Sequence, residues 1–182
     1  MKRKTFDAIL TSFGGILTIM LIVAGSLLLW GYNFADQNVH DQLAQQKIFF
    51  PAKGSPALAS PEIGPYLNQY AGQELLTGPQ AEAYANHFIA VHLQEIGGGL
   101  TYSQLSAKSE ADPSNAKLAG QVNTIFKGTT LRGLLLEAYA FWQIAQIALL
   151  ASIGAFVGAF CMLVLTFLGY LHLRKVSPDT MM

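Results

Sequence analysis

Two histidines and a glutamate that lie close together in the sequence are the side chains best suited to chemistry. His87, His92 and Glu95 fall within the stretch AEAYANHFIAVHLQEIG. Imidazole nitrogens and carboxylate oxygens are common zinc ligands, so these three residues form a weak candidate metal site. On an α-helix His92 and Glu95 would share a face, but His87 and His92 would diverge by about 140°. The zinc-protease pattern, with histidines four residues apart, is also missing. The spacing therefore favours half-buried polar side chains over a catalytic or metal site.

Other reactive side chains are few. Cys161, the single cysteine, lies in an apolar stretch and cannot form an intramolecular disulfide. Arg132 and Glu137 precede that stretch, and their spacing is typical of a solvated helix face. The alternative for Arg132 is a link between the last helix and the acidic central part of the chain. No nucleotide-binding or nucleophile motif is present, so the sequence predicts no enzyme and no cofactor.

Helices are the elements expected to position these residues. Thr77 and Pro79 predict the start of a helix over about residues 79–96, and three glycines at 97–99 predict its end. We expect further helices over residues 33–47, 62–74, 102–107 and 114–127. Gly128 is expected to end the last of these, and Thr129 or Thr130 to cap a new helix that continues toward the C-terminus.

Two long uncharged stretches dominate the rest of the chain. Residues 8–35 and 138–171 contain no Asp, Glu, Lys or Arg, although charged residues make up 12% of the whole chain. A helix of the second length would extend roughly 50 Å, and a bilayer core needs about 30 Å. The expected fold is therefore an all-α membrane protein, with two transmembrane helices extended into an extracytoplasmic helical bundle. The predicted segments are a tail over 1–8, a span over 9–31, an outer domain over 32–137, a second span with its outer extension over 138–171, and a tail over 172–182.

Charge predicts the orientation of these spans. The two short tails hold five of the eleven Lys and Arg residues, and cytoplasmic segments next to spans are enriched in these residues. We therefore expect both termini in the cytoplasm and the central domain outside the plasma membrane. The central part has nine acidic and six basic residues, a balance unsuited to nucleic acid.

Aromatic and small residues suggest how the spans are arranged. Aromatic side chains concentrate at membrane interfaces, and small residues at three- and four-residue spacing let helices approach closely. The predicted interface residues are Trp30, Tyr32, Tyr139, Trp142 and Tyr170. The predicted helix-packing residues are Ala151, Gly154, Ala155, Gly158 and Ala159. They could pack the two spans of one chain together or pack one chain against another subunit.

Several short segments resemble a family of uncharacterised two-span membrane proteins of actinobacteria. The segments are the basic start, Lys47-Ile48-Phe49, residues 80–87, the turn at 98–102, and Thr130-Leu131-Arg132. The resemblance implies the same two-span topology. Some members carry an automatic label of aromatic ring-opening dioxygenase, an activity that needs an iron site, and the three residues at 87, 92 and 95 would form a poor one.

The leading hypothesis is a non-enzymatic scaffold or accessory subunit of the cell envelope. Its expected partners are membrane lipid and another envelope protein or a second copy of the chain. A second hypothesis is a domain that binds a small molecule or lipid in an aromatic pocket. That pocket would be formed by Phe49, Phe50, Tyr66, Tyr70, Tyr84 and Phe88. A metal-dependent enzyme using the candidate metal residues is the third.

Overall fold

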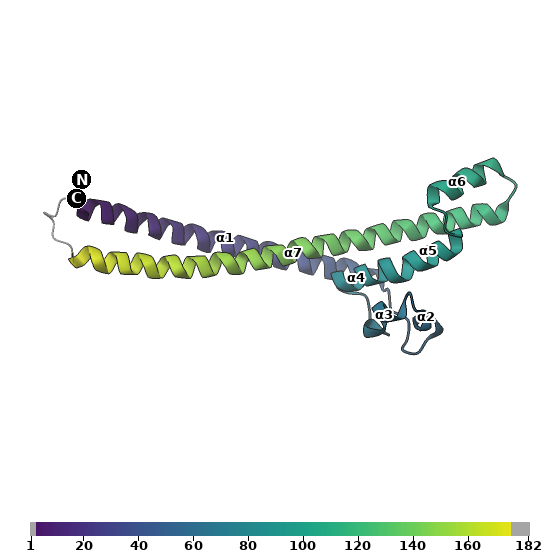
Figure 1. Cartoon of the computed structure of the whole chain (residues 1–182), viewed down its shortest axis with the longest axis horizontal. Coiled ribbons are helices and arrows are strands. Elements are labelled where there is room, and N and C mark those ends of the chain that lie inside the picture. The colour runs from purple at the N-terminus through teal and green to yellow at the C-terminus, as the bar shows by residue number, and fades with distance from the viewer. Residues whose placement is uncertain (1–2, 176–182) are drawn as a thin grey trace. The chain divides into compact units, whose positions relative to one another are not determined.

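Helices form the regular structure of the part of the chain described here. The structure is a computed structural model that describes residues 3–175. Its helices are α1 (Arg3–Gln46), α2 (Pro56–Ala59), α3 (Gly64–Leu67), the 3-10 turn η1 (Asn68–Tyr70), α4 (Gly78–Tyr84), the π-helical turn η2 (Ala85–Ile89), α5 (Ala90–Gly97), α6 (Tyr102–Ala111) and α7 (Ala116–Lys175) (Figure 1). A single antiparallel bridge joins Phe49 and Glu74 within this part of the chain. The expectation of an all-α fold is confirmed.

The chain divides into two compact units. The first combines Met1–Phe34 with Ile144–Met182, and the second is Ala35–Gln143. The long helices α1 and α7 each contribute to both units.

The first unit is an antiparallel pair of helices, formed by the parts of α1 and α7 that belong to it (Figure 1). One row of less exposed residues on each helix recurs at alternating three- and four-residue intervals. On α1 they are Asp7, Thr11, Gly14, Thr18, Leu21, Gly25, Leu28 and Tyr32, and on α7 they are Ala145, Ala148, Ser152, Ala155, Ala159, Met162, Thr166, Gly169 and Leu173. We call these two rows the seam. This 3.5-residue repeat is the pattern of helices that coil around each other.

Small residues bring the two helices of the seam very close together. A Cβ atom placed on Gly14 would lie 2.6 Å from Thr166 Oγ1, and one on Gly169 would lie 2.8 Å from Thr11 Oγ1. The buried Ser152 hydroxyl donates a 2.9 Å hydrogen bond to the carbonyl oxygen of Gly25. Small residues thus let the two helices approach closely at these positions.

Large apolar side chains cover the outside of the same helix pair. Leu150 is 69% exposed, and Phe13 is 63% exposed. Helices α1 and α7 are long and apolar enough either to cross a membrane or to form the core of a soluble protein. In the structure, most residues of their most apolar segments are not buried.

The second unit has its own apolar core. Leu67, Leu75 and Ala85 are fully buried there. They pack with Val39 and Leu43 of α1 and with Leu135 of α7. The expected helical continuation over residues 33–47 is confirmed, since α1 runs to Gln46. Within this part of α1, Val39 and Leu43 form the face of the helix that packs in the core of the second unit.

Local sequence explains where α4 and α5 begin and end. Thr77 and Gln80 form a capping box at the start of α4, with Pro79 in the first turn. Gly98 adopts φ +57° after α5, a left-handed conformation that glycine reaches without steric cost. These observations confirm the expected boundaries close to residues 79 and 96.

Several other expectations about the helices are wrong. Gly128 does not end a helix, because α7 continues through it from Ala116. Its lack of a side chain serves packing instead, since a Cβ there would clash with the side chain of Leu93. The helix expected over 62–74 is only α3 followed by η1, and the helix expected over 102–107 continues to Ala111. The helix over 79–96 has the expected ends but contains the π-helical turn η2.

Candidate functional site

The three candidate metal residues have separate surroundings. The ring of His87 stacks on that of Tyr66, with centroids 3.4 Å apart and planes 5° from parallel. The Nδ1 atom of His92 lies 2.7 Å from the carbonyl oxygen of Phe88. Glu95 is exposed. Within residues 3–175 no cluster of three or more His, Cys, Asp or Glu side chains is suited to hold a metal ion. The structure thus does not assemble these residues into one ligand set.

The π-helical turn η2 arranges the polar side chains around it. A π-turn accommodates one extra residue per turn, and such turns are frequent at functional sites. Asn86, within η2, donates a 2.8 Å hydrogen bond to Glu82 Oε1 and accepts a 2.7 Å hydrogen bond from Arg132 Nη2. The Nε atom of Arg132 is buried and has no hydrogen-bond partner among the described residues. Arg132 therefore links α7 to α4 through Asn86, as the alternative interpretation of the sequence proposed.

The aromatic residues expected to line a pocket mostly pack against one another. The Phe50 ring is 3% exposed and lies 5.2 Å from the Tyr70 ring and 5.4 Å from the Tyr84 ring. Tyr84 in turn contacts Phe88, at 4.7 Å between centroids. Burial raises the pKa of the Tyr84 phenol above its ordinary value of 10.0. Phe50 belongs to the core of the second unit and the other three rings are partly buried against that core, whereas Phe49 is 57% exposed.

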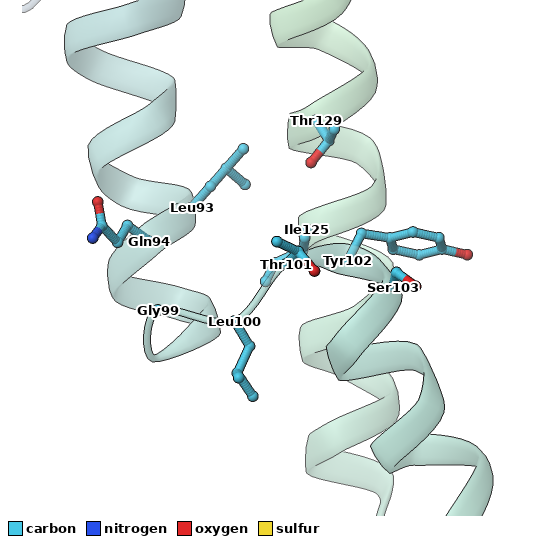
Figure 2. A pocket seen from close by; sticks show the side chains of 9 residues that line it. All are labelled: Leu93, Gln94, Gly99, Leu100, Thr101, Tyr102, Ser103, Ile125 and Thr129. Carbon is cyan, nitrogen blue, oxygen red and sulfur yellow. The ribbon is translucent and has the colours of Figure 1, made fainter.

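An open groove of about 350 Å³ lies elsewhere in the second unit (Figure 2). Ends or faces of three helices form it: α5, α6 and α7, together with the glycine turn before α6. Its lining residues are Leu93, Gln94, Gly99, Leu100, Thr101, Tyr102, Ser103, Ile125 and Thr129. None of them is charged, and the lining combines apolar side chains with a few hydroxyl and amide groups. Sequence analysis missed this groove because its residues come from separate segments.

The residues expected at membrane interfaces have different surroundings. Trp30 is 68% exposed and stacks on Phe34, and the Tyr170 ring lies 5.0 Å from the guanidinium carbon of Arg174. Tyr32 lies on the seam, and Tyr139 stacks on Trp142. Trp142 packs against the core of the second unit, where a Cβ on Gly78 would lie 2.5 Å from it.

The residues expected to pack helices divide into two groups. Ala155 and Ala159 lie on the seam, and a Cβ on Gly158 would lie 3.6 Å from Leu21 Cδ1. Ala151 is exposed, and a Cβ on Gly154 would have no neighbouring atom within 4 Å among the described residues. Cys161 is exposed as well. Only part of the predicted small-residue face is therefore used by the packing of α1 on α7.

No known family, no curated protein and no solved structure matches this chain. The resemblance to the actinobacterial two-span family stays a prediction.

Proposed function

We propose that the protein is an integral membrane protein with two spans, and that its second unit is a non-enzymatic scaffold or accessory domain for other envelope proteins. The spans would be the apolar parts of α1 and α7. Both termini would lie in the cytoplasm, next to the basic residues, and the second unit would lie outside.

The observation that carries this proposal is the inside-out side-chain pattern of the first unit. Its seam is lined mainly by small residues, and its outer surface by more than twenty exposed large apolar side chains. Full transfer of one large apolar side chain from water to an apolar environment is favourable by roughly 1.5–3 kcal/mol, and these partly exposed side chains would each gain part of that. An exposed apolar surface of this extent is unusual in soluble monomers, and lipid would cover it.

Membrane flotation tests the first part of the proposal. Full-length protein should float with membranes in a density gradient and resist extraction at alkaline pH. Recovery of folded protein in the soluble fraction, without detergent, would show that the two helices are a soluble core.

The binding role is supported by apolar side chains that stay exposed on the second unit. On α7 these are Phe126, Leu134 and Phe141, each more than half exposed. Large apolar side chains on a surface are typical of contacts with other proteins.

Full-length protein purified from native membranes in mild detergent should therefore co-purify with a partner protein or form an oligomer. The variant Leu134→Ser should no longer co-purify with the partner, whereas the control variant Asn123→Ser, at an exposed polar residue of the same helix, should still co-purify with it. A lone monomer with no partner would contradict the scaffold role.

The groove supports a second candidate function, the binding of a small uncharged molecule. Its volume is at the lower end of the range for ligand sites, and its lining combines apolar walls with a few polar groups. A thermal-shift screen of full-length protein with neutral metabolites and lipids tests this alternative. The shift should disappear in Ile125→Ala if the groove is the site. Unchanged melting with every compound would count against it.

A further inference from the structure

Asp7 is the only acidic residue in the described part of the first unit, residues 3–34 and 144–175. It lies on the seam, and its side chain is only 19% exposed. Its Oδ2 atom is buried and has no hydrogen-bond partner among the described residues. A half-buried carboxylate in this position needs a positive partner, because burial without one is costly.

Two side chains approach that oxygen. His172 Nε2 lies 3.8 Å from Asp7 Oδ2, and Arg3 Nε lies 3.9 Å from the same atom. Arg3 is one turn away on α1 itself, so it cannot connect the two helices. His172 belongs to α7, and the neighbouring turn is already in close contact through Gly169 and Thr11. Within the described residues, Asp7 and His172 are thus the ionisable pair across the seam.

We propose that Asp7 and His172 form a proton-dependent clasp that fastens the ends of α1 and α7 to each other. When His172 carries a proton, it is a cation beside the carboxylate and the contact becomes a charge-assisted interaction. When His172 is neutral, that attraction is lost. The clasp would make the distance between the two helix ends depend on the pH of the solution around them. This property is separate from the proposed scaffold role.

The other charged groups described at this end do not supply the same switch. They are Arg3, Lys4, Arg174 and Lys175, and Arg174 lies over the Tyr170 ring. Histidine is the side chain whose charge ordinarily changes between about pH 5 and 8, so the charges of these four residues are constant over that range. Their repulsion of one another and the attraction of Arg3 to Asp7 are then a fixed background, to which protonation of His172 adds a second attraction to Asp7.

Distance measurements between spin labels test the clasp in full-length, detergent-solubilised protein. The labels would replace Leu10 and Leu168, which are exposed on α1 and α7, in a Cys161→Ser background. We expect a shorter and narrower distance distribution at about pH 5.5 than at about pH 8. The melting midpoint should also be higher at the lower pH, by about 2 °C.

Three variants separate the clasp from other effects of pH. His172→Gln and Asp7→Asn should each abolish the pH difference in distance, whereas His172→Lys should give the short distance at both pH values. His40→Gln is the matched control, because His40 lies 3.3 Å from Asp41 on the same helix and both are exposed. It should leave the pH difference unchanged. A wild-type protein without any pH difference, or one that keeps it in His172→Gln, would overturn the proposal. Neither result bears on whether the second unit binds a partner.

Discussion

At the scale of single residues, the polar side chains of the second unit stabilise its fold through specific partners. Asn86 is hydrogen-bonded to both Glu82 and Arg132. The His87 ring stacks on Tyr66, and the His92 ring contacts the carbonyl oxygen of Phe88. A hydrogen bond to a charged group contributes about 1.5–3 kcal/mol, so the Arg132 link is a substantial contact between α7 and α4. Two of the three candidate metal residues, His87 and His92, thus contact neighbouring groups, whereas Glu95 is exposed.

Tyr84 gives a prediction of how stability depends on pH. Because burial raises its pKa in the folded state, the folded protein holds the phenolic proton more tightly than the unfolded chain does. This contribution to stability is complete below pH 10.0, the ordinary pKa, and is lost as the pH rises through the folded-state value. The free energy of unfolding should therefore fall as the pH is raised above about 10.

Chemical denaturation of full-length protein at several alkaline pH values measures this effect. Tyr84→Phe keeps the ring that packs on Phe50 and should make the alkaline loss of stability smaller. Tyr102→Phe is the control, since Tyr102 is 40% exposed, and it should behave like the wild type. An identical alkaline loss in all three proteins would show that Tyr84 does not contribute to it.

At the scale of elements, the seam between α1 and α7 depends on glycine at particular positions. Gly14 and Gly154 both lie in long helices, but only Gly14 faces a close neighbour. Gly14→Ala would place a Cβ 2.6 Å from Thr166 Oγ1 and 3.7 Å from Met162 Cε, so the neighbouring side chains on α7 would have to move. Substitutions that overfill a packed site cost about 1–3 kcal/mol.

Gly154→Ala is the matched substitution, because no described atom lies within 4 Å of its Cβ position. Alanine favours helix over glycine by roughly 0.5–1 kcal/mol, so this variant should be neutral or slightly more stable. We expect the melting midpoint in detergent to fall for Gly14→Ala only. Equal effects of the two substitutions would contradict the observed seam.

At the scale of the whole molecule, the proposed topology predicts which side chains a membrane-impermeant reagent can reach. Phe49 belongs to the second unit and is 57% exposed, and Lys4 is exposed in the first unit. In intact cells, Phe49→Cys in a Cys161→Ser background should react with an impermeant maleimide, and Lys4→Cys should react only after lysis. Labelling of Lys4→Cys in intact cells would show that the N-terminus lies outside the cell and would contradict the proposed topology.

The helical class, the two long apolar segments and the ends of the helical stretch near residues 79 and 96 were predictable from the sequence. These features depend on local quantities, such as hydropathy along the chain, helix-capping residues and the conformational freedom of glycine at Gly98. The extension of α1 to Gln46 follows from the same kind of signal, because residues 33–46 contain no helix breaker.

Contacts between residues far apart in the sequence could not be predicted in this way. A glycine such as Gly128 can either end a helix or leave room for a side chain from another segment. Here α7 continues through Gly128, and the side chain of Leu93 packs against it. Likewise Ala155 and Gly154 are both small and adjacent, but only Ala155 lies on the seam. The sequence gives the size and polarity of each residue, but the residues that surround it depend on how folding brings distant segments together. The Asn86–Arg132 link, the groove and the Asp7–His172 pair all arise from such long-range contacts.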